Sequence, residues 1–307
     1  MSRYIKFESN SLDNYKNTFN EMKHEIDFGY FAPPDKKRVC VDIGSNMGGF
    51  IYRMAELDAF EEIYAFEPAF QTYQTSLAIL GELNVLNSDR RIFNLAVADK
   101  SGQIYTLFDN ADGYSGNASL SADINPNRDK SIQQQSENVL TISLDGIFDL
   151  LGLDYIDYLK MDCEGAELAV LGNSRNLDKI GAMMIECHTV DGVDLLPSVV
   201  SVLSNAGFHV NCFTGAPPPS QGQAKMSETE KLALAEPVLF AVDVKKHRKD
   251  YKGWWRRGIK DGEVVERVSM GDIEAETHYT GDTYGEAYER YQKGLKLTRN
   301  LKKEATN

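Results

Sequence analysis

A strand–turn–helix signature, V-C-V-D-I-G-S-N-M-G-G-F, is the sequence feature with the clearest chemistry. An apolar strand reaches Asp42, and Gly44 and Gly48 then let the backbone turn tightly and approach a ligand at a helix N-terminus. The spacing differs from the G-x-G-x-x-G dinucleotide fingerprint, because only the turn glycine and the helix-start glycine are present. Such turns also occur for purely structural reasons, so this one indicates only an α/β domain that could bind a nucleotide.

An acidic residue at the end of the next expected strand narrows the ligand. Glu67, in Y-A-F-E-P, lies 25 positions after Asp42. An acid at the tip of the second strand of such a unit accepts hydrogen bonds from ribose hydroxyls. A solvated strand-end carboxylate is the structural alternative. Together, the glycine turn and Glu67 favour a cofactor that contains a nucleoside.

Two later segments, K-M-D-C-E-G-A-E and I-E-C-H, place acids and a histidine after buried strands. α/β sheets bind ligands at the carboxyl ends of their strands, so we expect the acids and the histidine to lie at one edge, with Asp162 and Glu164 facing the cleft. A carboxylate or imidazole there can remove the proton of a hydroxyl or amide acceptor. The catalytic candidates are Asp162, Glu164, Glu186 and His188, although His188 can equally be a strand-end histidine without a catalytic role.

Glu167 follows Glu164 by three positions, and we expect both to share one face of the first turn of a helix. The helix dipole stabilises carboxylates there, so Glu167 is open to a structural interpretation as well as to substrate contact. The acids and His188 could also bind Mg²⁺, which prefers oxygen ligands.

The elements that position these residues follow from an alternation of apolar and amphipathic segments. Strand-length apolar runs alternate with helix-length segments, which predicts βαβ units and a mostly parallel, doubly wound α/β sheet covered on both faces. Between about 99 and 144 the alternation stops, and we expect a β-hairpin-like insertion with strands over 103–108 and 138–144. The other expected strands are 38–43, 62–68, 91–97, 158–165, 182–188, 209–213 and 238–244, and the expected helices are 48–57, 72–83, 166–173 and 195–206.

The motifs D-I-G-S-N-M-G, A-F-E-P, K-M-D-C-E-G-A-E-L-A-V-L and I-E-C-H occur in an order and spacing that resemble the FkbM family of methyltransferases over residues 38–244. The resemblance implies a Rossmann-like class I methyltransferase sheet with an antiparallel last strand, S-adenosylmethionine as cofactor and no metal. The cofactor residues that it implies are Asp42, Gly44, Ser45, Asn46 and Gly48 for the amino-acid part, Glu67 and Pro68 at the ribose, Asn94 and Ala96 at the adenine, and Asp162 beside them.

Two loops are candidates for substrate contacts. The segment 113–121 is similar to a Ser-rich loop that lies by the active site in FkbM relatives, and Ser119 or Asn117 could bind substrate there. A flexible connector is the alternative. The Pro/Gly/Ser-rich segment 214–237 is a second loop that could cover the site.

Beyond the expected sheet, the chain has a basic, Trp-containing extension. Residues 245–260 carry a net charge of +7 in a chain of net charge −13. This run could dock an acidic peptide, a carrier protein or a phosphorylated substrate, or it could pack Trp254 and Trp255 on the acidic core. The extension is also where a homo-oligomer could form. We therefore divide the chain into an N-terminal helical cap (1–37), a methyltransferase domain (38–244) and a C-terminal extension (245–307).

Composition excludes several classes of protein. Apolar residues at 42% and charged residues at 26% are ordinary globular values. The net charge of −13 repels polyanions, so we expect no nucleic-acid partner. No stretch approaches the roughly 18 apolar residues that span a bilayer, and the start lacks a signal-peptide core, so we expect a cytoplasmic protein without a membrane partner. The four cysteines lack C-x-x-C spacing, and we expect reduced thiols.

The leading hypothesis is therefore methyl transfer from S-adenosylmethionine to an oxygen, or to an amide nitrogen, of a small metabolite, saccharide or peptide natural product. Two alternatives remain open. One is an NAD(P)-dependent oxidoreductase on the same kind of sheet, against which the missing middle glycine argues. The other is a non-catalytic cofactor-binding protein that acts through its extension.

Overall fold

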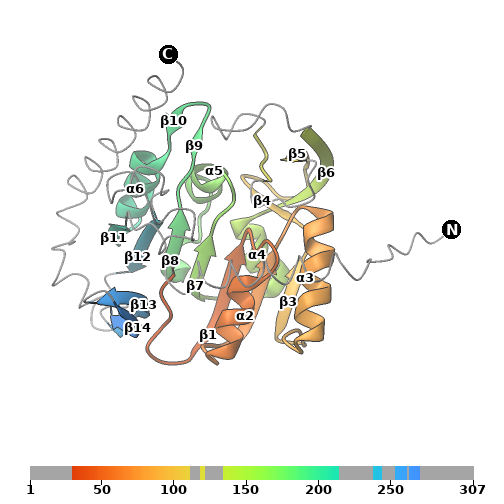
Figure 1. Cartoon of the computed structure of the whole chain (residues 1–307). Helices are drawn as coiled ribbons and strands as arrows, with labels where there is room; N and C mark the ends of the chain where they lie inside the picture. The colour runs from red at the N-terminus through yellow and green to blue at the C-terminus, as the bar shows by residue number, and fades with distance from the viewer. Residues whose placement is uncertain are drawn as a thin grey trace, which may run out of the picture.

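A seven-stranded sheet forms the centre of the molecule. The computed structural model describes residues 30–110, 118–121, 134–213, 238–243, 253–260 and 263–269. The strands of the sheet lie in the order β11-β12-β8-β7-β1-β2-β3 (Figure 1). Their bounds are β1 (Lys37–Ile43), β2 (Phe60–Phe66), β3 (Arg90–Phe93), β7 (Ile156–Met161), β8 (Ile180–Glu186), β11 (Phe208–Phe213) and β12 (Val238–Asp243).

The direction of the strands defines the fold. Neighbouring strands are parallel except at β12, which runs antiparallel to both β8 and β11. The strand order reverses at β1, which pairs with β2 on one side and with β7 on the other. Ligands of open α/β sheets bind at the carboxyl ends of the strands beside such a reversal. The arrangement confirms the doubly wound class I methyltransferase fold and its antiparallel last strand.

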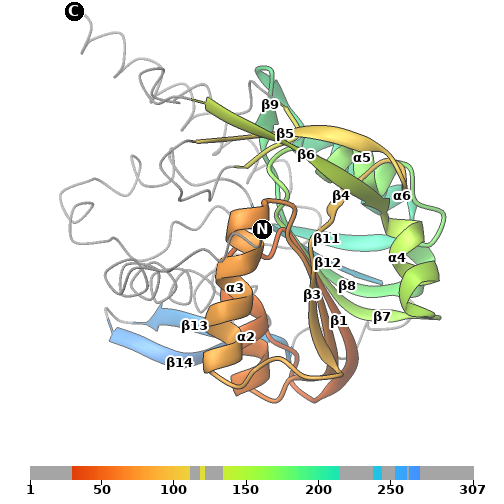
Figure 2. The same ribbon diagram turned by 90° about the vertical axis from the view of Figure 1, so that its right-hand side faces the viewer.

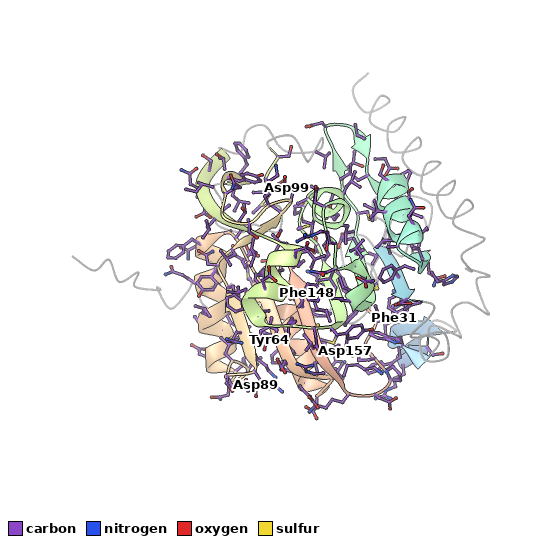
Figure 3. The ribbon with its side chains drawn as sticks, turned by 180° about the vertical axis from the view of Figure 1, so that it is seen from behind. Phe31, Tyr64, Asp89, Asp99, Phe148 and Asp157 are labelled. Carbon is purple, nitrogen blue, oxygen red and sulfur yellow. The ribbon has the colours of Figure 1, made fainter. Side chains whose placement is uncertain are left out.

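Helices cover both faces of the sheet (Figure 2). Their apolar side chains recur at helical spacing and face the strands; α4, for example, buries Leu144, Ile147 and Phe148. Figure 3 shows Phe148 in front of the sheet, with Asp89 and Asp157 near the amino ends of the strands and Asp99 towards the opposite edge. No described helix has the length and hydropathy of a membrane span. One face carries α2 (Gly49–Glu56) and α3 (Phe70–Glu82), and the other carries α4 (Leu144–Leu151), α5 (Glu167–Gly172) and α6 (Leu196–Asn205).

The central strands are buried on both faces, which explains why they are continuous apolar runs rather than alternating ones. In β8, six of seven residues are buried. Val41 and Leu159 belong to the core on the α4–α6 side, whereas Cys40 and Tyr158 belong to the core on the α2–α3 side. All four cysteines are free thiols, three of them buried, in line with the sequence-based expectation.

The interval between β3 and α4 contains the expected insertion. The antiparallel hairpin of β5 (Ile104–Asn110) and β6 (Gln134–Ser143) is present, and β4 (Ala96–Ala98) pairs with β6 in parallel. The sequence predicted one strand over 91–97, but the chain leaves the main sheet after β3. The interruption falls at Asn94, whose side chain bonds to backbone carbonyls of a neighbouring loop.

A segment that precedes β1 pairs with a segment that follows β12, beside the sheet. Ala32 and Trp255 form an antiparallel bridge through backbone hydrogen bonds of 2.7 and 3.0 Å. Trp254 is 1% exposed and packs edge-on against Tyr158 of β7. A tryptophan buried in the core therefore precedes the hairpin of β13 (Trp255–Lys260) and β14 (Glu263–Ser269) (Figure 1). Most of the predicted cap (1–29), the loop 214–237 and the extension segments 245–252 and 270–307 lie outside the described residues.

Candidate active site

The turn between β1 and α2 passes so close to its neighbours that two positions require glycine. Gly44 has φ of 73°, and a Cβ there would lie 1.7 Å from the carbonyl oxygen of Asp162. Gly48 has φ of 84°, and a Cβ there would lie 2.5 Å from the side chain of Leu80. Asn46 between them also has a left-handed backbone, with φ of 49°, which is strained for a residue with a Cβ. The motif therefore encodes a tight turn held under strain.

Glu67, the residue that follows β2, holds this turn from the side. Its carboxylate accepts the backbone N–H groups of Asn46 at 2.8 Å and of Ala69 at 2.9 Å. Burial raises the pKa of Glu67 to about 7, even though the two N–H donors and the nearby Lys160 favour the ionised form. Two backbone hydrogen bonds therefore fix the position of this buried carboxyl group, and its pKa lies near neutral pH.

A pocket opens at this edge of the sheet. Six of the predicted cofactor residues line it, and the insertion and the segment after β7 supply the other walls. The lining residues are Gly44, Asn46, Glu67, Pro68, Ala96, Val97, Leu107, Ala118, Leu120, Asp162, Cys163 and Glu164.

The other predicted cofactor residues, Asp42, Ser45, Gly48 and Asn94, lie outside this lining. The side-chain amide of Asn94 donates to the carbonyl oxygens of Glu67 at 3.0 Å and of Pro68 at 2.7 Å, so it positions the wall that they form. The hydroxyl of Ser45 and the side-chain oxygen of Asn46 are buried without a hydrogen-bond partner in the described part of the chain. Buried polar atoms are normally bonded, so a ligand with polar groups would complete this turn.

A buried cation that sequence analysis did not single out links the two halves of the site. Lys160 of β7 is 5% exposed, and its Nζ donates to the carbonyl oxygen of Gly44 at 2.7 Å. The same Nζ lies 3.3 Å from Asp42 Oδ1 and 3.5 Å from Asp162 Oδ2. Burial opposes the charge of Lys160, but the surrounding carboxylates, Asp42 first, raise its pKa. Asp42 is fully buried, and burial raises its pKa despite the ammonium.

His188 is held by Glu167 and faces two further acids. Its Nδ1 lies 2.9 Å from Glu167 Oε1, which also accepts the backbone N–H of Gly165 at 3.1 Å. Its Nε2 lies 3.4 Å from Glu164 Oε2 and 3.8 Å from Asp162 Oδ1. Glu167 is fully buried; burial opposes its ionisation, but the bonds from His188 and the backbone lower its pKa. The site therefore contains an acid that orients the imidazole, which sequence analysis left open as structural.

Glu164 departs from the sequence-based prediction. Helix α5 begins at Glu167, and Glu164 precedes it with a left-handed φ of 51°, so the two acids do not share a helical turn. Ser119 of the insertion stabilises this conformation, because its hydroxyl donates to the carbonyl oxygen of Glu164 at 2.8 Å. Ser119 is 3% exposed, which favours a positioning role over substrate binding. Asn117 lies outside the described residues.

Glu186, at the end of β8, is close enough to Lys160 to raise its pKa together with Asp42 and Asp162. It accepts the hydroxyl of Tyr30 at 3.1 Å and does not line the pocket. Burial, with the nearby Glu186 and Asp162 carboxylates, raises the pKa of Tyr30 well above its usual value. The ring of Tyr30 lies 5.8 Å from Lys160 Nζ. Tyr30, from the predicted cap, therefore reaches the site.

Comparisons with known proteins match this chain to methyltransferases. The model of the methyltransferase FkbM domain matches residues 42–210. The 2-O-methyltransferase NoeI of Sinorhizobium fredii (strain NBRC 101917 / NGR234) is 28% identical over 143 residues, 45% of this chain and 57% of that protein, so the match spans less than two thirds of the relative. Two solved structures are similar in fold. Methyltransferase FkbM from Methylobacillus flagellatus KT has a TM-score of 0.43 and 17% identity and covers 68% of this chain and 44% of that one. TrmK of M. capricolum, in complex with S-adenosyl-homocysteine, has a TM-score of 0.37 and 11% identity. The match covers 74% of this chain and 67% of TrmK.

Proposed function

Because the chain belongs to the FkbM methyltransferase family, we propose that it transfers a methyl group from S-adenosylmethionine to a hydroxyl oxygen of a small metabolite, saccharide or peptide. The observation that carries the proposal is the juxtaposition of two groups at one sheet edge. One group, around Gly44, Asn46 and Glu67, suits a nucleoside cofactor. The other, around Asp162, Glu164 and His188, suits an acceptor that must lose a proton.

The turn fits S-adenosylmethionine on the chemistry of its donors and acceptors. Glu67 would accept the ribose hydroxyls, and the apolar wall of Ala96 and Leu107 would contact the base. The unpartnered oxygens of Ser45 and Asn46 would bond the amino-acid part. When bound, the cofactor supplies an electrophilic methyl group on a sulfonium, and the chain's task is to align the acceptor with it.

The acceptor side of the site is built to receive a proton. Glu167 fixes the ring of His188 through Nδ1 and leaves Nε2 directed at Asp162 and Glu164, both of which line the pocket. An imidazole held in this way contributes about 10²- to 10⁴-fold as a general base. We assign acceptor deprotonation to these residues; Glu186, the fourth candidate, is the partner of the Tyr30 hydroxyl.

One observation favours oxygen over nitrogen as the acceptor atom. The curated relative bears the name 2-O-methyltransferase. A substrate screen that includes both hydroxylated and amide acceptors tests the choice of acceptor atom.

The test is a calorimetric titration of the purified protein with S-adenosylhomocysteine and, separately, with NAD⁺. We expect S-adenosylhomocysteine to bind and NAD⁺ not to bind. Glu67→Gln should weaken binding about 10-fold or more, because hydrogen bonds to a charged group contribute about 1.5–3 kcal/mol. Glu61→Gln, at an exposed position of β2, is the matched control and should bind normally. Binding of NAD⁺ alone would replace the proposal with the oxidoreductase alternative.

Catalysis is tested by product formation. With labelled S-adenosylmethionine and a panel of hydroxylated saccharides, peptides and metabolites, methylated product should form with the wild-type chain. Asp162→Asn and His188→Ala should each reduce turnover by about 10²-fold or more, and His188→Ala should still bind S-adenosylhomocysteine. Unchanged turnover in both variants would remove the catalytic assignment and leave a cofactor-binding protein.

A further inference from the structure

Three side chains of metal-binding type converge beside the pocket. Asp162 and Glu164 follow β7, and His188 follows β8, so the parallel pairing of the two strands brings them together. Each offers one ligand atom, and these atoms lie within 4.8 Å of one another. Ligands about 2.1 Å from one octahedral ion are roughly 3.0 to 4.2 Å apart, so small side-chain movements would allow shared coordination.

The histidine of this cluster is fixed by a residue outside it. Glu167 Oε1 also accepts the backbone N–H of Gly165, so it acts as an acceptor, and the hydrogen-bond network assigns the Nδ1 proton of His188 to this contact. The lone pair of Nε2 then points towards Glu164 and Asp162. A buried carboxylate that holds one ring nitrogen while the other faces ligand oxygens is the second-shell arrangement of histidine metal sites.

The concentration of negative charge around His188 also favours a bound cation. Three carboxylates, Asp162, Glu164 and Glu167, surround one imidazole that is 5% exposed. Lys160 lies on the far side of Asp162 and also pairs with Asp42. Carboxylates this close together need a compensating cation. A metal ion bound between these carboxylates would supply such a charge.

We propose that Asp162, Glu164 and His188 form a binding site for a divalent first-row transition metal ion. Two carboxylates and one imidazole suit Mn²⁺ or Zn²⁺ better than Mg²⁺, which keeps an all-oxygen octahedral shell. Asp162 and Glu164 line the pocket, so the remaining coordination positions face the place where an acceptor would bind. The proposal rests on the proposed function for its purpose and would replace the imidazole as proton acceptor, because Nε2 of His188 would then be a ligand. The metal would bind the acceptor's hydroxyl oxygen and lower its pKa, and the proton would leave to solvent.

The test uses Mn²⁺ as the probe and does not depend on turnover. Full-length protein is stripped with EDTA, desalted and titrated with Mn²⁺ under electron paramagnetic resonance, and pulsed spectra are recorded for ¹⁴N coupling from a coordinating imidazole. We expect one saturable site, competed by Zn²⁺, with ¹⁴N coupling. Asp162→Asn should weaken Mn²⁺ binding at least 10-fold, and His188→Gln should abolish the ¹⁴N coupling. Glu167→Gln, which alters only the second shell, should weaken binding about 10- to 100-fold.

Controls separate this proposal from misfolding and from the proposed function. Asp89→Asn, at an exposed position near the amino ends of the strands, should bind Mn²⁺ normally, and circular dichroism reports folding of each variant. Absence of saturable Mn²⁺ binding, or binding without ¹⁴N coupling, would overturn the metal site. Full methyl transfer in EDTA would also overturn it while leaving the proposed function intact. A chain that binds Mn²⁺ as expected but does not bind S-adenosylhomocysteine would contradict the proposed function and leave the metal site intact.

Discussion

Glu67 makes the stability of the protein depend on pH in a direction opposite to that of most carboxylates. In the folded chain, burial raises the pKa of Glu67 to about 7, whereas in the unfolded chain the group returns to about 4.5. Between these values the folded state holds a proton that the unfolded state has released. The free energy of unfolding therefore falls as pH rises through this window.

The size of the effect follows from the two pKa values. The difference between 4.5 and about 7 corresponds to about 3 kcal/mol at 1.36 kcal/mol per pH unit. About 2.5 kcal/mol of this falls between pH 5 and pH 8, since the group has begun to ionise in the unfolded chain at pH 5. Glu67→Gln cannot titrate, so the difference in unfolding free energy between wild type and variant isolates this carboxyl group.

The assay is urea unfolding of both chains at several pH values, without ligand. Relative to Glu67→Gln, the wild type should lose about 2.5 kcal/mol from pH 5 to pH 8. Glu61→Gln, at an exposed position of β2, is the control and should lose stability over this range as the wild type does. A difference between wild type and Glu67→Gln that stays within about 0.5 kcal/mol over this range would refute the reasoning.

Cofactor binding supplies a second readout of the same group. If Glu67 must be ionised to accept ribose hydroxyls, only about a tenth of the protein is competent at pH 6 and about nine tenths at pH 8, given the pKa of about 7. The affinity of the wild-type chain for S-adenosylhomocysteine should therefore rise about 10-fold between these pH values. Glu67→Gln should show no such rise.

Further predictions concern packing and the buried ion pair. Gly44→Ala should destabilise the chain by on the order of 3 kcal/mol in urea unfolding, because its Cβ would overlap the backbone beyond β7, whereas Gly152→Ala, with φ of 64° and open space, should cost about 1 kcal/mol. Equal costs would contradict the steric argument. Lys160→Met should cost about 3–5 kcal/mol by leaving Asp42 buried and unpaired, and Asp42→Asn in the same chain should recover part of it; no recovery would mean that the charge is not the cause. Trp254→Ala should cost about 3–5 kcal/mol, and a loss under 1 kcal/mol would show that the extension does not depend on the core.

The fold was largely predictable because the buried strands are continuous apolar runs separated by helix-length segments. The direction of β12 was a different matter. A strand buried on both faces has the same residue pattern whether it runs parallel or antiparallel, so the antiparallel β12 followed from the family resemblance and not from periodicity. The division of the expected strand 91–97 into β3 and β4 depends on hydrogen bonds from Asn94 to Glu67 and Pro68. These residues are more than 25 positions away in sequence, so no local pattern records the contact.

The candidate site was predictable to the extent that strand ends share one edge. Gly44, Glu67 and Asp162 were expected together for that reason, and they line one pocket. The contact between Glu167 and His188 joins residues 21 positions apart and depends on how β7 and β8 pair, so sequence spacing could not reveal it. Lys160 left a visible signal, a lysine inside the apolar run I-D-Y-L-K-M, because a cation buried in a strand needs acids nearby.

The position of β12 has a consequence for attempts to shorten the protein. The family match ends at residue 210, before β12, yet β12 lies between β8 and β11 and forms ladder hydrogen bonds with both. A chain trimmed to the matched residues would expose the backbone N–H and C=O groups of β8 along a hydrophobic edge and would also lose Trp254. Such edges pair with other chains. A minimal version cut at the family boundaries is therefore expected to aggregate, and the residues that the family model leaves unmatched protect the sheet.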